Sequence, residues 1–140
     1  MFQLGEGFRD LIVWQKAYQL VLEIYKITKK FPKYELFGLT SQLTRAAVSV
    51  PANIAEGYER QHKREYIQFL TIARGSLGEV ETYLMLAKDL EYIEKDTYNN
   101  LEEKRQEIGR LLRGLTRSLA NGKGQGTSSK GQGKILTLDP

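Results

Sequence analysis

The sequence predicts an all-α protein: an antiparallel up-down-up-down four-helix bundle with a Pro-kinked second helix. Three observations lead to this fold class. Apolar residues recur at steps of three and four through most of the chain, which is the period of an amphipathic helix. No stretch alternates with period two for long enough to indicate a strand. The segments between the periodic runs are short, and short connections make consecutive helices antiparallel neighbours.

The first helix is expected between Phe8 and Pro32, because proline removes a backbone donor and ends the helical run. Asp10 is expected to be its N-cap, since an Asp side chain accepts hydrogen bonds from the free N–H groups of a first turn. The repeating apolar positions of this helix are Phe8, Leu11, Trp14, Tyr18, Val21, Leu22 and Tyr25.

The second helix contains Pro51, within the stretch SVPANIAEG. A proline inside a helix deletes one hydrogen bond and collides with the preceding turn, at a cost of about 3 kcal/mol. The apolar stripe nevertheless keeps one phase on both sides of Pro51, which favours a single bent helix over two short ones. Ser49 or Asn53 could satisfy the backbone groups that Pro51 leaves free. The stripe consists of Leu39, Leu43, Ala46, Ala47, Val50, Ile54 and Tyr58.

Two further helices follow. The apolar positions of the third are Tyr66, Phe69, Leu70, Ala73, Leu77, Val80, Leu84 and Ala87. Those of the fourth are Leu101, Ile108, Leu112, Leu115 and Leu119. Asp96 is expected to cap the fourth helix. His62, the only histidine, lies between the second and third helices, where a turn or capping role is expected.

The bundle is expected to occupy residues 1–120, followed by a flexible Gly/Ser/Lys tail over residues 121–140. The start of that tail, NGKGQGTSSKGQG, has the composition of a flexible linker. The net charge of +4 divides evenly between the two parts, so the bundle itself is almost balanced. Net charge is therefore weak support for nucleic-acid binding.

The composition argues against several functional classes. There is no cysteine, so disulfides, thiol nucleophiles and Cys-based metal sites are impossible. One histidine without clustered carboxylates predicts no metal site, and no nucleophile–base–orienter set is visible. We expect no enzyme activity and no cofactor. With no signal-peptide pattern and only short apolar runs, a cytoplasmic protein with no membrane span is expected.

Three stretches carry a resemblance to a known family. They are FRDLIVWQKAYQLVLEIYKITKKFPKYELFGL, SQLTRAAVSVPANIAEGYER and FLTIARGSLGEVETYL. Over about residues 8–119 the chain resembles the bacterial four-helix-bundle family of 23S rRNA intervening-sequence proteins. The resemblance implies a four-helix bundle that can assemble as a ring-like homopentamer. More distantly, the chain is similar to the accessory protein of diversity-generating retroelements, which binds a reverse transcriptase and nucleic acid.

Several residues are candidates for a subunit interface or a structural motif. The first and third helices are apolar beyond one stripe, which indicates contact with other copies or, alternatively, a wide core. Gly75 and Gly78 cost about 1 kcal/mol each in a helix interior, and close helix packing is the expected reason. Glu56 pairs with Arg60 at i+4 or with a neighbouring subunit. The full set is Arg45, Ser49, Pro51, Asn53, Glu56, Arg60, Gly75 and Gly78.

A basic row on the fourth helix is the candidate nucleic-acid site. Arg110, Arg113 and Arg117 share one face, opposite the apolar stripe, and could contact phosphates. They could equally serve to oppose the helix dipole near a C-terminus, and Glu103 and Glu107 are expected to weaken the patch. Three tail lysines, Lys123, Lys130 and Lys134, would add to it. Three tyrosines, Tyr34, Tyr58 and Tyr98, could stack on bases or pack at helix ends.

The sequence thus predicts a non-enzymatic homo-oligomer, expected to be a pentamer, that binds RNA or DNA through charge and largely without regard to base sequence. The alternative is a protein-interaction scaffold or an accessory subunit that recruits a reverse transcriptase through the bundle surface.

Overall fold

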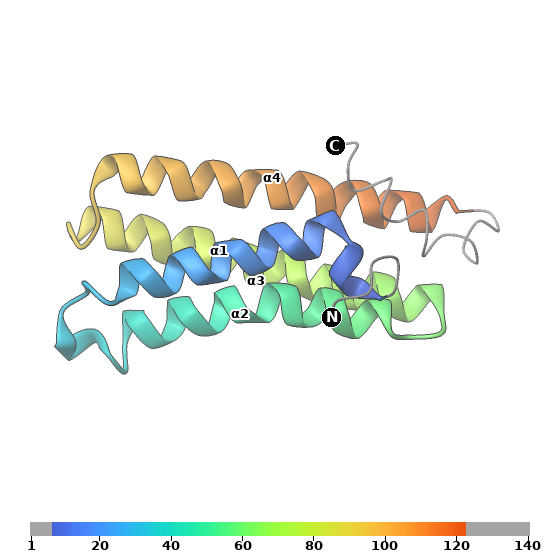
Figure 1. The fold of residues 1–140 in the computed structure, drawn as a ribbon, viewed down its shortest axis with the longest axis horizontal. Helices are drawn as coiled ribbons and strands as arrows, with labels where there is room; N and C mark the ends of the chain where they lie inside the picture. Colours follow the sequence, from blue (N-terminus) through green and yellow to red (C-terminus); the bar gives the residue numbers. More distant parts are fainter. Residues whose placement is uncertain (1–6, 123–140) are drawn as a thin grey trace.

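The computed structural model describes residues 7–122, and these residues form helices and connecting turns only. The four long helices are α1 (Ile12–Thr28), α2 (Leu39–Tyr58), α3 (Lys63–Asp89) and α4 (Lys95–Ala120), and two short 3₁₀ helices, η1 (Phe8–Asp10) and η2 (Lys33–Glu35), precede α1 and α2. The predicted all-α four-helix class is confirmed. The helices lie side by side and the chain turns back at each connection, which is compatible with the predicted up-down topology (Figure 1).

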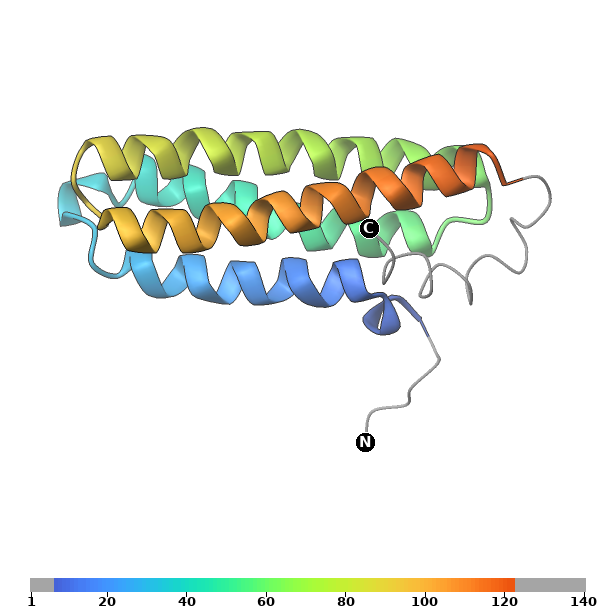
Figure 2. The ribbon, with the colours of Figure 1, turned by 90° about the horizontal axis from the view of Figure 1, so that it is seen from above.

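The core runs along the length of the bundle, between the four helices. It is built from the stripe positions of every helix, for example Ile24 of α1, Leu43 of α2, Leu84 of α3 and Leu112 of α4, all with essentially no exposed surface. Figure 2 shows α4 running alongside both α1 and α3. Within residues 7–122, no helix combines the length and the apolarity that a bilayer crossing needs.

Helix α2 continues through Pro51 without interruption, so the predicted single helix is confirmed. Pro51 is itself buried, in line with the apolar stripe. The side-chain amide of Asn53 donates to the carbonyl of Ser49 at 2.8 Å. Pro51 deprives the carbonyl of Ala47 of its helical donor. The Asn53 amide bonds a different carbonyl, that of Ser49.

Two predicted helix caps are wrong. Asp10 is buried in η1, and the N-cap of α1 is Leu11, which has no side-chain cap hydrogen bond. The backbone turns tightly before α1, and the N–H of Leu11 donates to the carbonyl of Phe8 at 2.9 Å. Asp10 therefore lies inside this turn and not at the N-cap position. Asp96 lies inside the first turn of α4, whose N-cap is Glu94. His62 does occupy the N-cap position of α3, without a side-chain cap hydrogen bond.

Gly57 is the residue that allows α2 and α3 to approach closely near their shared connection. A Cβ atom at this position would lie 2.8 Å from Cβ of Phe69 and 3.0 Å from Cδ1 of Tyr66. No real side chain fits in that space, so a residue larger than glycine would push the two helices apart. Gly57 is thus required for the close packing of α2 on α3.

Candidate nucleic-acid interface

The predicted arginine row lies on the outward face of α4. Arg110, Arg113 and Arg117 are all exposed, while Leu112 and Leu115 on the opposite face are buried. The row occupies the half of α4 that ends at Ala120. The predicted continuation at Lys123, Lys130 and Lys134 lies outside the described residues.

Helix α3 brings two further cations to this row. A Cβ atom on Gly109 would lie 3.4 Å from Nη1 of Arg113 and 3.6 Å from Cδ2 of Leu77, so Arg113 lies where α4 meets α3. Arg74 is exposed and lies one turn from Leu77, toward the end of the bundle where α4 finishes. At that end, Nζ of Lys63 would be 3.3 Å from a Cβ atom on Gly122.

We call Lys63, Arg74, Arg110, Arg113 and Arg117 the α3–α4 basic surface. Reasoning from the sequence missed Lys63 and Arg74, because they belong to another helix and no pattern along the chain pairs them with α4. The signal that could have found them is the antiparallel register: a short connection after α3 places the beginning of α3 beside the end of α4.

None of the five cations forms an ion pair with a residue in the described part of the chain. Of the two acidic residues expected to weaken the row, Glu107 forms an ion pair with Lys16 of α1, with Oε2 at 3.4 Å from Nζ. Glu103 is exposed on α4 and forms no ion pair with a described residue, so its weakening effect on the row stays a prediction. The other two basic residues of the middle of α4 are already paired: Lys104 contacts Glu23 at 2.7 Å and Arg105 contacts Glu102 at 2.7 Å.

The pair between Glu102 and Arg105 is held more firmly than the others on α4. Nε and Nη2 of Arg105 both donate to the Glu102 carboxylate, at 2.8 and 2.7 Å. These hydrogen bonds lower the pKa of Glu102 and raise the pKa of Arg105. Glu81 of α3 lies 3.4 Å from the same guanidinium. Glu81, Glu102 and Arg105 thus form one charge cluster between α3 and α4.

Two of the three candidate tyrosines pack at helix ends, which is the predicted alternative to stacking on bases. Tyr58 is half-buried and meets Tyr66 edge-on, with ring centroids 6.1 Å apart. Tyr98 is half-buried under Nζ of Lys88, which lies 4.7 Å from the ring centroid. Tyr34 is exposed, at the end of the bundle far from Arg117, and its hydroxyl lies 3.5 Å from that of Tyr92.

The polar side of α2 is largely engaged within the chain. The Oγ atoms of Ser49 and Ser76 are 2.7 Å apart, and the Asn53 amide donates to Oγ of Ser49 at 2.9 Å, which links α2 to α3. Glu56 pairs with Arg60 at i+4, the intrachain option of the prediction. The guanidinium of Arg60 also lies 4.9 Å from the ring centroid of Phe69. Arg45 is exposed.

The two glycines of α3 do not serve close packing inside this chain, which corrects the sequence-based expectation. A Cβ atom on Gly75 or on Gly78 would meet nothing within 4 Å. Both face outward, and Ile72, Met85 and Leu86 are exposed on the same helix. The local sequence could not distinguish Gly57, which touches α3, from these two, because helical spacing does not say which neighbour covers a face.

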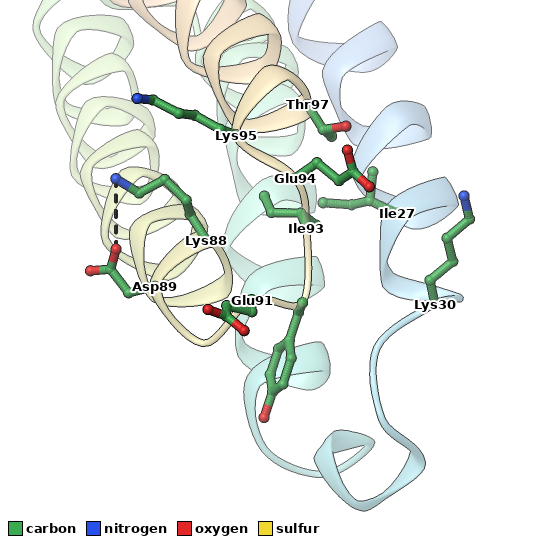
Figure 3. Close-up of a pocket in the computed structure, with 10 residues that line it drawn as sticks. Ile27, Lys30, Lys88, Asp89, Glu91, Ile93, Glu94, Lys95 and Thr97 are labelled. Atoms are coloured by element: carbon green, nitrogen blue, oxygen red, sulfur yellow. Dashed lines mark ion pairs between the residues drawn. The ribbon is translucent and has the colours of Figure 1, made fainter.

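A hollow lies at the turn between α3 and α4, close to the end of α1 (Figure 3). It has a volume of about 720 Å³ and is lined by charges of both signs, including the Lys88–Asp89 ion pair at 3.6 Å. Within residues 7–122 no group of three or more His, Cys, Asp or Glu side chains has the arrangement of a metal site. Mixed, exposed charge of this kind does not define a binding chemistry.

Comparison with known proteins agrees with the resemblance noted from the sequence. The family model described as "23S rRNA-intervening sequence protein" matches residues 9–114. A crystal structure of a protein of unknown function from the S23 ribosomal protein family of Bacteroides thetaiotaomicron VPI-5482 is similar, with a TM-score of 0.68 and 28% identity. The similarity covers 72% of this chain and 94% of that chain. No match was found among curated proteins.

Proposed function

We propose, from the premise that this chain belongs to the family of 23S rRNA-intervening sequence proteins, that it is a homo-oligomeric, non-enzymatic protein that binds nucleic acid through the α3–α4 basic surface. One observation carries the proposal: Lys63, Arg74, Arg110, Arg113 and Arg117 come from two helices to one face and form no ion pair with a described residue. Unpaired cations gathered on one face are what contact with phosphates requires.

The helix dipole does not account for this surface. Arg117 lies in the last turn of α4, where a cation opposes the dipole favourably. Lys63, however, is the first residue of α3, where the dipole disfavours a cation. A role in stabilising helix ends would place an acidic residue there instead. The position of Lys63 therefore supports an external negative partner. The following lysines, Lys123, Lys130 and Lys134, would add positive charge to the same contact.

The proposed oligomer, a homopentamer, is supported by the outward face of α3. Glycine in a helix interior costs about 1 kcal/mol relative to alanine, and Gly75 and Gly78 have no intrachain contact that requires them. With Ile72, Met85 and Leu86 exposed nearby, the face suits close approach by another copy of the chain. Several copies would present several basic surfaces to one nucleic acid, and avidity would strengthen a modest contact per copy.

The test is a titration of fluorescently labelled structured RNA and DNA, followed by anisotropy between about 50 and 200 mM salt. We expect affinity to fall steeply with salt and to be weakened by Arg113→Glu with Arg117→Glu. The matched control, Lys26→Glu with Lys95→Glu, makes the same change in net charge at exposed sites elsewhere and should bind normally. Binding that ignores salt, or equal loss in both variants, would contradict the proposal. Light scattering tests the oligomer, and a monomer at micromolar concentration would rule it out.

A second candidate, a scaffold or accessory subunit that recruits a reverse transcriptase or another protein, is favoured by a different observation. The loop before α2 exposes Leu36 by 55% and Phe37 by 92%. An aromatic side chain held out on an ordered loop is typical of a protein contact. Under this alternative, Phe37→Ser should abolish capture of the protein partner while leaving the fold and any salt-sensitive RNA binding unchanged.

A further inference from the structure

We infer that the nucleic acid recognised by the α3–α4 basic surface is double-helical. The inference rests on the proposed function and adds the class of ligand to it. Two features carry it: the cations belong to two adjacent antiparallel helices, and the exposed aromatic side chains lie elsewhere on the molecule. The first feature suits two phosphate backbones, and the second excludes the stacking platform on which binding of a single strand depends.

The cations are spread over an area that matches a duplex better than a single strand. Lys63 and Arg74 are about 16 Å apart along α3, and Arg110 and Arg117 about 10 Å apart along α4, at 1.5 Å per residue. The two packed helix axes are separated by about 8–10 Å. A duplex carries about one phosphate per 1.7 Å of its axis, counting both strands, whereas one strand carries half that number. A single strand could follow one row of cations, while a duplex can engage both.

No exposed aromatic side chain lies on α3 or α4 in the described structure. Those that are exposed, Tyr18, Tyr25, Tyr34 and Phe37, belong to α1 and to the loop before α2. The sequence from residue 121 to residue 140 contains no aromatic residue either. Proteins that hold single strands gain about 1–3 kcal/mol per base from stacking on aromatic rings. This surface lacks that contribution, so backbone charge must supply the affinity.

The same composition predicts that the contact does not distinguish one base sequence from another. Arg and Lys on a surface formed by two helices reach phosphates, and phosphate contacts position a protein without reporting base sequence. Recognition of double-stranded RNA proceeds mainly through shape and backbone contacts of this kind. We therefore expect the binding affinity to depend only weakly on base sequence. Comparing duplex RNA with duplex DNA of equal length then shows which helical form fits the surface better.

The experiment compares a 20-base-pair duplex RNA, the same duplex as DNA, and an unstructured single strand of equal length, each titrated into the full chain by anisotropy at one salt concentration. We expect at least one duplex to bind ten times more tightly than the single strand, or better. Arg113→Glu with Arg117→Glu should remove most of that preference, whereas Lys26→Glu with Lys95→Glu should retain it. Circular dichroism establishes that all variants are folded.

Trp14 supplies an independent readout, because it is the only tryptophan and lies on α1, stacked on Tyr18 with ring centroids 5.0 Å apart. Duplex binding to α3 and α4 should leave its fluorescence unchanged. Quenching of Trp14 by the bound duplex, or a single strand that binds as tightly as the duplexes, would overturn this inference while leaving nucleic-acid binding in place. Failure of all three nucleic acids to bind would overturn the proposed function itself.

Discussion

The hydroxyl of Tyr92 donates a 2.8 Å hydrogen bond to Oε2 of Glu35, joining two connections that are far apart in the sequence. Oε1 of the same carboxylate accepts the backbone N–H of Leu39, at 2.9 Å, in the first turn of α2. Glu35 therefore caps α2 from outside the helix and ties that cap to the turn between α3 and α4. The ring of Tyr92 also packs on Phe31, with centroids 5.3 Å apart.

The cap predicts a pH-dependent contribution to stability. The hydrogen bond from Leu39, followed by that from Tyr92, lowers the pKa of Glu35 below its ordinary value of 4.5. A carboxyl group whose pKa is lower in the folded chain stabilises the fold above its unfolded pKa, and this stabilisation is lost as pH falls through the folded pKa. Glu35→Ala should therefore lower the urea midpoint at pH 7, and the difference from wild type should shrink below pH 4.5. The exposed Glu103, changed to Ala, is the control and should give a smaller loss at pH 7.

Gly57→Ala should destabilise the bundle by about 1–3 kcal/mol, the usual cost of overpacking. The added methyl group would lie 2.8 Å from Cβ of Phe69, which is fixed to the backbone of α3 and cannot rotate away. Denaturant unfolding followed by circular dichroism measures the effect. An unchanged midpoint would show that α2 and α3 do not approach as closely as described.

Gly75→Ala and Gly78→Ala should have the opposite effect on the isolated bundle. Each replaces a glycine on an open helix surface, so the fold should gain up to about 1 kcal/mol per site. If the outward face of α3 contacts another copy, the same changes should weaken association, because the new methyl groups hold the chains apart. Thermal unfolding of the dilute protein measures the first effect and light scattering the second. Unchanged association in the double variant would exclude this face from the interface.

Glu91→Gly should stabilise the protein by up to about 1 kcal/mol, the cost of holding an ordinary L-residue in the left-handed region. Glu91 has φ of 65° and ends α3 with a hydrogen bond from the N–H of Tyr92 to the carbonyl of Ala87 at 2.8 Å. Glycine is the usual residue in this position. Asp89→Gly, within the last turn of α3, is the matched control and should destabilise, since glycine is unfavourable in a helix.

Arg105→Met should cost about 1–3 kcal/mol, because it removes both hydrogen bonds that Arg105 donates to the carboxylate of Glu102 and leaves only the one from Gln106, at 3.2 Å. Both side chains are only about one-eighth exposed, so water can replace little of the lost interaction. Lys104→Met, at the adjacent position, breaks the more exposed pair with Glu23 and should cost less than about 1 kcal/mol. Urea unfolding measures the loss of stability in both variants. A larger loss for Lys104→Met than for Arg105→Met would contradict this ranking.

The position of each helix, and the face that it buries, follow from local properties of the chain. Helical periodicity depends on residues three and four apart, so the stripe of α2 could be followed through Pro51 and the helix predicted as one element. The same periodicity placed Arg110, Arg113 and Arg117 on one outward face. The family resemblance also depends on contiguous stretches of sequence, and it needed no coordinates.

The tertiary structure decided which residues meet. Asp10 and Asp96 carry the right chemistry for caps, yet the 3₁₀ turn before α1 and the earlier start of α4 displaced both, while Glu35 became a cap through a contact between loops. Gly57 and Gly78 look alike in the sequence, but one touches Phe69 and the other faces outward.

The tertiary structure likewise decided that Lys63 and Arg74 of α3 lie beside the arginine row of α4. The register between antiparallel helices depends on how their side chains interlock across the whole bundle. That interlocking involves residues distant in the sequence, so no local pattern encodes it, and the basic surface became visible only once α3 and α4 were placed side by side.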